Sequence, residues 1–380
     1  MRVLFLSARV GVGHTAAAQA VRTALRGLVP HCETETVDSY KYAASIFAKI
    51  VAEGYIGMVK TVPQLYRYIY HRAERAERIP KLRSWLNTFT AGNLRSLIAA
   101  RKPDVVVCTH AFPCGVMAEY KRTIDPDLPV VGVVTDFVVH PFWVYRNIDA
   151  YAVATTEMAE TLAARGVERS RILVSGIPVD PRFGAPRLPV DELRRELELP
   201  RNGPLVLMMA GGIGIGPLEA MMRALAAVPG PVAAAVIVGR NERLEVRVRE
   251  AAQQLNYPLR VYGFVENVYD FMHASDVLVS KPGGLSTSEA LAAQLPMVLV
   301  QPLPGQEERN TQYLVSRNAA VQAFDEPELG AMLAQLLQSP QRLAALRDRA
   351  RAVRKPEAAA HVAHRILTLA QRARSREDAR

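Results

Sequence analysis

The sequence predicts an α/β protein with two domains, each built around a parallel β-sheet. Short apolar runs alternate with segments of helical periodicity, which is the pattern of repeated βαβ units. Many of these runs end in glycine or polar residues, as strands do where they lead to a ligand-binding edge. The pattern breaks at a proline-rich stretch, residues 176–189, and then starts again. A chain of 380 residues is long enough for two domains of ordinary size.

Composition narrows the class of protein. Hydrophobic residues make up 49% of the chain, which predicts a packed core and excludes an intrinsically disordered protein. The three cysteines lack the spacing of a disulfide framework or a metal site, and they indicate a reducing compartment. No apolar run reaches the ~18 residues of a membrane-spanning helix, and Met1 leads directly into a strand rather than a signal peptide. We therefore expect a cytoplasmic protein.

The formal net charge of +10 is concentrated in two segments. Residues 41–85 contain nine Lys and Arg against three Asp and Glu, and residues 340–380 contain eleven against four. Residues 40–86 also mix aliphatic and aromatic side chains with the basic ones, as helices on anionic membrane surfaces do. The alternative is an ordinary helical insertion with a solvated basic face. The mixture predicts peripheral association with the cytoplasmic membrane, and no nucleic-acid partner, because no RNA-binding signature is present.

The first domain opens with a strand, a glycine turn and a helix. Gly11, Gly13 and Ala16 in this turn fit the fingerprint of dinucleotide-binding proteins. Asp38, at the end of the second strand, fits it as well, so a nicotinamide-dependent oxidoreductase is a competing interpretation. His14 argues against it, because an imidazole at the helix start would crowd a pyrophosphate but suits acid–base catalysis. The alternative role of His14 is a helix cap.

Polar and aromatic residues follow the later strands of this domain. The strands are predicted over residues 3–7, 33–37, 104–109, 130–135, 150–155 and 172–175. Asp136 follows the fourth strand and could orient His14 or bind an acceptor hydroxyl; the alternative is a turn aspartate. His140 and Trp143 come next, and Trp143 is either a platform for a lipid or sugar or a buried aromatic.

The second domain repeats the pattern after the proline-rich hinge. Its strands are predicted over residues 205–210, 232–238, 259–262, 276–280 and 297–301. Glycine or polar residues follow four of them, at Gly211-Gly212, Gly239-Arg240, Gly263-Phe264-Val265 and Gly283-Gly284. Helices close the chain at residues 326–351 and 356–373. We expect domains over residues 1–180 and 181–355, with a closing helix and tail over 356–380.

Residues 276–314 read as strand, glycine turn, helix, strand and polar loop. Backbone N–H groups of a glycine turn and the positive end of the next helix form an anion site, suited to a diphosphate. In the loop after the second strand, Gln306, Glu307 and Asn310 could reach sugar hydroxyls. The alternatives are a tight connection at the glycines and a capping box formed by Ser286 and Glu289. The whole arrangement favours a sugar-nucleotide site.

Two stretches in this region, Ser280–Leu291 and Pro304–Asn310, resemble the donor-site signature of monogalactosyldiacylglycerol synthases and bacterial diacylglycerol glucosyltransferases. The first glycine turn with His14 resembles the first motif of that family, and the segment from Thr135 to Trp143 resembles its acceptor-side motif. The resemblance extends over nearly the whole chain. It implies a GT-B fold, in which two Rossmann-like domains face each other across a cleft and the last helix returns to the first domain.

The resemblance also implies an activity: inverting transfer of glucose or galactose from a UDP-sugar to diacylglycerol, without a metal or other cofactor. The implied catalytic residues are His14, as the base, and Asp136. The implied donor-binding residues are Gly211, Gly212, Arg240, Phe264, Val265, Gly283, Gly284, Leu285, Ser286, Glu289, Gln306, Glu307 and Asn310. The implied acceptor-binding residues are Gly13, His140 and Trp143. Phe264-Val265 would read uracil, Glu289 the ribose, and Gln306 with Glu307 the sugar.

Two local departures from the family pattern bear on these roles. Val12 stands inside the first glycine turn, where plant members have glycine, but His14 keeps its place. Arg309 replaces a small residue before Asn310, which adds a cation beside the sugar pocket and leaves the choice between glucose and galactose open. A transferase or epimerase acting on a soluble UDP-sugar, and the nicotinamide-dependent oxidoreductase, are the alternative functions.

Overall fold

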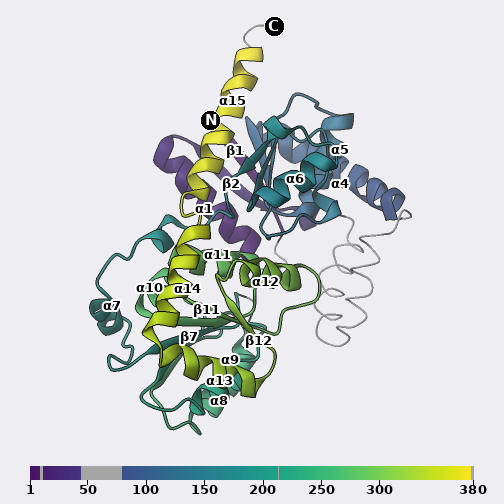
Figure 1. Cartoon of the computed structure of the whole chain (residues 1–380). Coiled ribbons are helices and arrows are strands. Elements are labelled where there is room, and N and C mark those ends of the chain that lie inside the picture. The colour runs from purple at the N-terminus through teal and green to yellow at the C-terminus, as the bar shows by residue number, and fades with distance from the viewer. Residues whose placement is uncertain (9–11, 44–78, 213, 378–380) are drawn as a thin grey trace. The chain divides into compact units, whose positions relative to one another are not determined.

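In the computed structural model of the chain, residues 1–8, 12–43, 79–212 and 214–377 are described (Figure 1). The chain divides into two compact units. The first comprises residues 1–178, 304–306 and 357–380, and the second comprises residues 179–303 and 307–356. Each unit contains one six-stranded sheet in which every strand pair is parallel. The predicted α/β fold with two parallel sheets is confirmed.

The sheet of the first unit has the strand order β2-β1-β3-β4-β5-β6. Its strands are β1 (Arg2–Ser7), β2 (Glu33–Asp38), β3 (Val105–Cys108), β4 (Val130–Val133), β5 (Ala150–Val153) and β6 (Ile172–Val174). Its helices are α1 (Gly13–Leu28), η1 (Ser39–Tyr42), α4 (Ile79–Arg101), α5 (Ala111–Thr123), η2 (Pro141–Trp143), α6 (Thr156–Ala164), η3 (Arg169–Arg171) and α15 (Ala358–Glu377). The central strands are valine-rich because a parallel sheet is covered on both faces.

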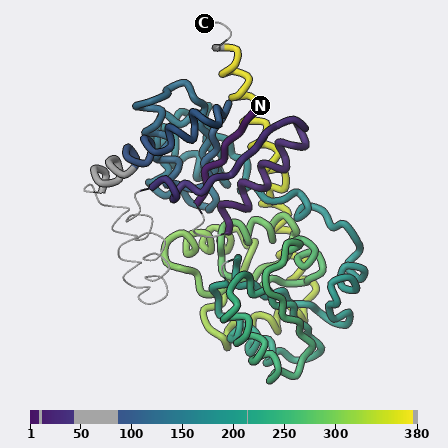
Figure 2. The backbone as a smooth tube through the Cα atoms, turned by 180° about the vertical axis from the view of Figure 1, so that it is seen from behind, coloured from purple at the N-terminus to yellow at the C-terminus, as the bar shows by residue number. Residues whose placement is uncertain are grey.

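The C-terminal helix α15 belongs to the first unit, although the whole second unit precedes it in sequence. It lies against α1, and both views show the yellow helix beside the purple N-terminal elements (Figures 1 and 2). Its buried Ile366 joins the core cluster that contains Phe5 and Val107 of the sheet. Near its end, Arg374 forms an ion pair with Asp104 at 3.1 Å. The last helix therefore completes the core of the first unit.

The sheet of the second unit has the order β12-β11-β10-β7-β8-β9. Its strands are β7 (Leu205–Met209), β8 (Ala233–Ile237), β9 (Leu259–Tyr262), β10 (Val277–Ser280), β11 (Met297–Val300) and β12 (Val321–Ala323). Its helices are η4 (Pro181–Gly184), α7 (Val190–Glu196), α8 (Leu218–Ala226), α9 (Glu242–Ala252), α10 (Val268–Ala274), α11 (Gly284–Ala292), α12 (Gln306–Ser316), α13 (Glu326–Leu337) and α14 (Pro340–Val353). Strand β12 was not predicted, because three residues at a sheet edge give no apolar run.

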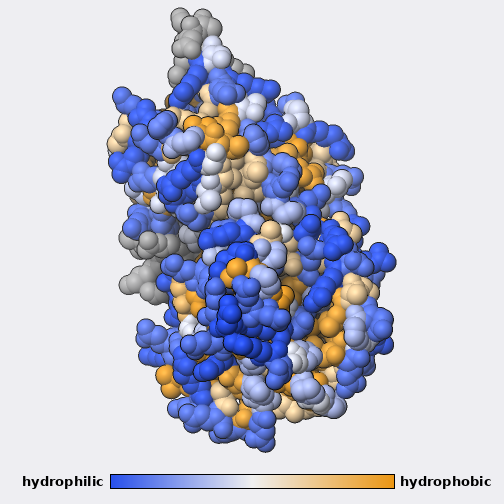
Figure 3. All heavy atoms as spheres, turned by 90° about the vertical axis from the view of Figure 1, so that its left-hand side faces the viewer, coloured by the Kyte–Doolittle hydropathy of each residue, from blue (hydrophilic) through white to orange (hydrophobic). Residues whose placement is uncertain are grey.

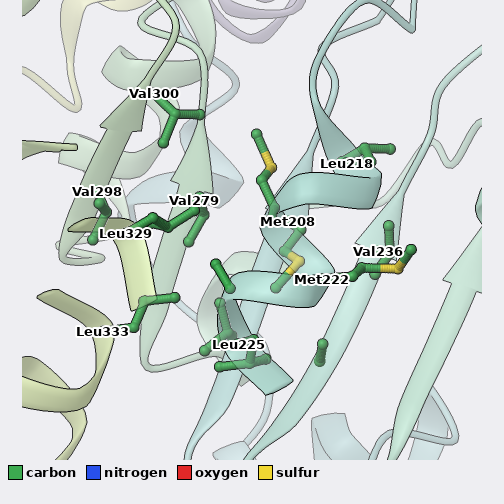
Figure 4. Close-up of a cluster of buried hydrophobic side chains, with 14 of the residues drawn as sticks. Met208, Leu218, Met222, Leu225, Val236, Val279, Val298, Val300, Leu329 and Leu333 are labelled. Atoms are coloured by element: carbon green, nitrogen blue, oxygen red, sulfur yellow. The ribbon is translucent and has the colours of Figure 1, made fainter. Parts of the chain in front are cut away.

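The core of the second unit fills the space between its sheet and the helices on one face. Figure 4 shows Met208, Val236 and Val279 of the strands in one cluster with Leu225 of α8 and Leu333 of α13. These five side chains are completely buried. Burying a large aliphatic side chain contributes about 1.5–3 kcal/mol, so this cluster holds the ends of β7, β8 and β10 in fixed positions.

The strand order of each sheet reverses at one place. In the first unit, β1 pairs with β2 on one side and with β3 on the other; in the second unit, β7 pairs with β8 and with β10. Loops after the two strands at such a switch point separate to opposite faces of the sheet and leave a crevice between them. The fold therefore predicts ligand sites after β1 and β3 and after β7 and β10.

The predicted membrane-associating region falls largely on residues 44–78, which lie outside the described residues. No helix in the described part of the chain is both long and apolar enough to cross a bilayer. On the face drawn in Figure 3, hydrophilic residues predominate and hydrophobic side chains form separate groups.

Candidate active site

His14 is the second residue of α1 and follows the strand β1 at the switch point of the first unit. Its Nδ1 lies 2.9 Å from the carbonyl oxygen of Thr109, which follows β3, and 2.9 Å from Oγ1 of Thr135 after β4. A carbonyl oxygen can only accept, so Nδ1 carries the proton of the neutral ring. The lone pair is therefore on Nε2, which is the form of imidazole that a general base requires.

Burial keeps this imidazole neutral. Desolvation lowers the pKa of His14 from 6.5 to about 4, and the hydrogen bond to Thr109 counters part of that effect. Part of the ring surface is still accessible, since the residue is only half-buried. At neutral pH the ring is thus unprotonated and can receive a proton.

The contacts of His14 differ in part from those expected. Asp136 was predicted to orient the ring, but the described contacts of Nδ1 go to Thr109 and Thr135. Thr135 stands directly before Asp136 in the predicted acceptor-side motif, so the contact with His14 is made by the neighbouring residue. Thr109 acts through its backbone, which no side-chain pattern could reveal. Binding of an acceptor hydroxyl by Asp136 stays a prediction.

Two of the other predicted acceptor residues, His140 and Trp143, are buried and form hydrogen bonds within the first unit. His140 is buried, and its Nδ1 accepts a hydrogen bond from the backbone N–H of Phe142, which caps η2. Trp143 is 5% exposed, and its carbonyl accepts from the hydroxyl of Tyr151. This burial favours the alternative of a core aromatic over a lipid or sugar platform. Gly13 is the first residue of α1, beside His14.

The structure places a second imidazole at this switch point. His110 follows β3, and its ring meets that of His14 edge-on, with centroids 4.7 Å apart. Tyr40 and Phe112 stack next to it with centroids 5.0 Å apart. His110 was not among the predicted site residues, because nothing in its spacing links it to His14.

Two buried hydroxyls at the same edge have no hydrogen-bond partner. They are Oγ of Ser7, the last residue of β1, and Oγ1 of Thr109 after β3; Oγ1 of Thr90, in α4, is a third case among the described residues. Buried polar atoms are almost always paired, so unpaired ones call for an explanation. Those of Ser7 and Thr109 stand where the fold predicts a ligand.

In the second unit, backbone groups rather than side chains lie at the switch point. Gly211-Gly212 follows β7 and Gly283-Gly284 follows β10, on the two strands of the switch point. Gly283 is the N-cap of α11, and a Cβ built on it would meet nothing within 4 Å. The N–H groups of Gly284, Leu285 and Ser286 open the helix and have no intrahelical carbonyl to bond. Open space beside a helix N-terminus is suited to an anion.

Gly239 packs against the turn at Gly211-Gly212. Gly239, after β8, has φ +85°, a conformation that favours glycine. A Cβ at this position would lie 2.7 Å from the carbonyl oxygen of Gly211, which is too close. The turns after β7 and β8 therefore pack backbone against backbone.

Glu289 is not part of a capping box. Gly283 is the N-cap, no side chain caps the helix, and Ser286 lies inside it. Desolvation raises the pKa of Glu289 to about 7, with a contribution from the negative charge of Asp180. The position of the N-cap excludes the capping alternative. A half-buried carboxyl group with a raised pKa is typical of a functional site, so a ligand contact of Glu289 is favoured.

Other predicted donor residues lie in pairs. Arg240 stacks over the ring of exposed Phe264, 3.7 Å from its centroid, and Val265 follows half-buried. The carboxylate of Glu307 contacts Nζ of Lys281 at 3.3 Å and accepts from the backbone N–H of Leu303 at 2.7 Å. Lys281 was missed as a site residue, although it stands in the quoted motif.

The remaining two donor residues lie on α12. Asn310 is fully buried, and its Nδ2 donates to the carbonyl of Pro282 at 3.0 Å. It holds the glycine turn rather than facing a sugar, so this assignment changes to a positioning role. Gln306 is the first residue of the helix. Across the described residues, no group of three or more His, Cys, Asp or Glu side chains is placed to hold a metal ion.

Comparison with known proteins shows the family to which the chain belongs. The family model for monogalactosyldiacylglycerol (MGDG) synthase matches residues 14–179, and that for glycosyl transferases group 1 matches residues 190–353. The chain is 30% identical over 369 residues to the processive diacylglycerol beta-glucosyltransferase of Bacillus mycoides, covering 96% of this chain and 93% of that protein. The chain belongs to this diacylglycerol glycosyltransferase family. The resemblance found in the sequence is confirmed.

Two solved structures of other proteins are similar in fold to this chain. MurG of Acinetobacter baumannii matches with a TM-score of 0.63 at 18% identity, covering 97% of this chain and 99% of MurG. Anabaena HepE in complex with UDP and glucose matches with a TM-score of 0.54 at 15% identity over the whole of both chains. At this identity the likeness establishes the fold, and the GT-B class is confirmed.

Proposed function

We propose that this protein is an inverting glycosyltransferase that moves a hexose from a UDP-sugar to the free hydroxyl of diacylglycerol. The observation that carries the proposal is the neutral His14, whose Nε2 lone pair stands at the switch point of the first unit in a chain of this family. His14 takes the proton of the lipid hydroxyl, whose oxygen attacks C1 of the sugar. The bond from C1 to UDP breaks, UDP leaves with the electron pair, and C1 is inverted.

The departing UDP needs stabilisation where its charge develops. The N–H groups at the start of α11 and the positive end of that helix supply it without a metal ion. Glu289 accepts hydrogen bonds from the ribose, Phe264 and Val265 contact uracil, and Gln306 with Glu307 holds the sugar. Lys281 fixes the carboxylate of Glu307 in the orientation that this role requires.

The acceptor lipid resides in a membrane, so the enzyme must reach one. We propose peripheral association with an anionic surface of the cytoplasmic membrane through the basic and aromatic residues of the 40–86 region and the basic residues of 340–380. Flotation with vesicles tests this: the protein should float with vesicles containing phosphatidylglycerol and stay below in ~1 M salt, where charge is screened. Equal flotation with neutral vesicles would exclude the electrostatic part.

The nicotinamide alternative loses its main support. Asp38, which would bind the ribose of that cofactor, accepts a hydrogen bond from the backbone N–H of Tyr40 at 3.2 Å and caps η1. His14 stands at the N-terminus of α1, where the pyrophosphate would lie.

The direct test is incubation with diacylglycerol in anionic vesicles and radiolabelled UDP-glucose or UDP-galactose, followed by lipid chromatography. We expect the label of one UDP-sugar to enter a glycolipid, and the His14→Gln variant to leave it in the aqueous phase. Label that stays water-soluble with the wild-type enzyme and both donors would refute the proposed acceptor.

A further inference from the structure

His110 has a fixed tautomer. Its Nδ1 accepts a hydrogen bond from the backbone N–H of Phe112 at 3.1 Å, which caps α5. A backbone N–H can only donate, so Nδ1 has no proton, and the neutral ring carries it on Nε2. Burial, with the neighbouring His14, lowers the pKa of His110 well below its usual value, which keeps the ring neutral.

The two imidazoles of this switch point therefore present opposite groups. His14 has its proton on Nδ1 and a lone pair on Nε2, whereas His110 has a lone pair on Nδ1 and an N–H on Nε2. Among the described residues, neither Nε2 has a protein partner, and neither belongs to the buried atoms that lack one. Both atoms therefore reach accessible space, one as a base and one as a hydrogen-bond donor.

The chemistry of the reaction decides which oxygen this donor can serve. A hydrogen bond to the attacking oxygen would hold the electron pair that must form the new bond to C1. A hydrogen-bond donor beside the base can instead bind a second oxygen of the acceptor, one that does not react. In diacylglycerol the nearest such oxygens are those of the esters, and a carbonyl is the better acceptor.

We propose that His110 recognises the acceptor: its Nε2–H donates to an ester carbonyl oxygen of the lipid while His14 takes the hydroxyl proton. This inference rests on the proposed function. The surroundings of His110 suit it, because half-buried Tyr40 and Phe112 stack beside the ring, with Tyr40 at 6.1 Å from the centroid of His110. Apolar neighbours exclude water and strengthen such a hydrogen bond.

Two substitutions separate the donor from the other properties of His110. His110→Ser keeps a side-chain oxygen that can cap Phe112 N–H but removes the ring from His14. His110→Phe keeps a ring against His14 but removes both the cap and the N–H. Loss of the Nε2–H at its position is the property that the two variants share. Asp325→Ala removes an N-cap in the second unit and controls for the loss of a cap alone.

The measurement compares two acceptors with identical chains, a diacylglycerol and the dialkylglycerol ether that lacks both carbonyl oxygens. We expect the wild-type enzyme to prefer the ester. In both His110 variants, kcat/KM for the ester should fall about tenfold, mainly through KM, as expected for one lost hydrogen bond. The ether should be used equally by all three enzymes, so the preference disappears, and Asp325→Ala should keep it.

The alternatives give different results. If His110 only caps α5, His110→Phe loses thermal stability and both variants keep the preference for the ester. If the ring only packs on His14, His110→Ser loses kcat with both lipids and His110→Phe behaves as wild type. Either result, or a wild-type enzyme that uses ester and ether equally, would overturn the inference. A wild-type enzyme that glycosylates neither lipid would overturn the proposed function itself.

Discussion

The two switch points present different parts of the chain to a ligand. After β1 and β3, the groups that we propose for the chemistry are side chains: the imidazoles of His14 and His110, each held in one tautomer by a backbone group. After β7 and β10, they are backbone groups: glycine turns and the first N–H groups of α11. An imidazole can change its protonation state and a backbone amide cannot. The first unit is thus suited to proton transfer, and the second to holding a charge that does not change.

The sharpest test of this difference is removal of the base. His14→Ala should lower kcat by about 10²–10⁴, the usual contribution of a general base. Its UDP affinity, measured by titration calorimetry, should equal that of the wild type, because the proposed UDP site lies in the second unit. Exposed His31→Ala in the same unit is the matched control and should leave both values unchanged. Turnover retained by His14→Ala would remove this residue as the base.

The glycine turn before α11 should instead be sensitive to an added side chain. Gly283→Ala places a methyl group in the open space beside α11, where the diphosphate is expected. We expect UDP affinity to fall about 10–100-fold, as when 1–3 kcal/mol of hydrogen bonding is lost. The fold should tolerate the change, because φ is −65° and no atom lies within 4 Å.

Gly92→Ala is the control for Gly283→Ala. Gly92 lies in α4 of the other unit, and a Cβ there also meets nothing within 4 Å. This variant should bind UDP normally, and as a helix-interior glycine replaced by alanine it should gain about 0.5–1 kcal/mol of stability. Normal UDP binding by Gly283→Ala would place the diphosphate elsewhere.

The same contrast explains which features of the structure could be predicted from the sequence. The alternation of buried strands with helices predicted eleven of the twelve strands in the described residues, because each apolar run has its own local signal. The glycine turns were found because glycine itself is the signal. The hydrogen-bond partners of His14 were not predicted. Every residue type has a backbone carbonyl, and the approach of the Thr109 carbonyl to His14 depends on the register of β1 and β3.

Exposure was the second property that the sequence could not supply. Trp143, His140 and Asn310 were assigned to ligands by their motifs, yet all three are buried. The side chains of His140 and Asn310 bond to backbone groups, and the carbonyl of Trp143 accepts from the hydroxyl of Tyr151. Ser286 and Glu289 have the spacing of a capping box, but the helix begins at Gly284, so the same spacing falls inside it. Motifs predicted where the site lies, and packing decided which of their residues stay accessible.

The pKa of the Glu289 carboxyl group is raised, and this side chain should contribute less to UDP binding than the glycine turn. Glu289→Gln should weaken UDP about tenfold through the loss of hydrogen bonds to the ribose. With the pKa of Glu289 raised to about 7, wild-type affinity should improve as pH rises from 6 to 8, because the ionised form is the better acceptor. The variant keeps only the pH dependence of UDP itself. Unchanged affinity would leave Glu289 without a ligand role.

The smallest expected effect is on stability, and here the two sites should respond to pH in opposite directions. The folded pKa of His14 is about 4, below the 6.5 of an unfolded histidine, so the unfolded chain binds more protons between these values and acidification destabilises the protein through this group. The folded pKa of Glu289 is about 7, above the unfolded 4.5, so stability falls as pH rises through this window. Each group contributes at most about 1.4 kcal/mol per pH unit.

Paired melting curves at pH 5, 6, 7 and 8 measure these two contributions. The melting temperature of His14→Gln minus that of the wild type should increase toward pH 5, because glutamine cannot be protonated in the unfolded chain. The same difference for Glu289→Gln should increase toward pH 8, because glutamine removes the cost of burying a carboxylate. Slopes of the same sign, or two flat lines, would mean that the surroundings of the two side chains do not perturb them in opposite senses. The contrast between a neutral base and a carboxyl group that resists ionisation would then be wrong, even if both residues proved essential for activity.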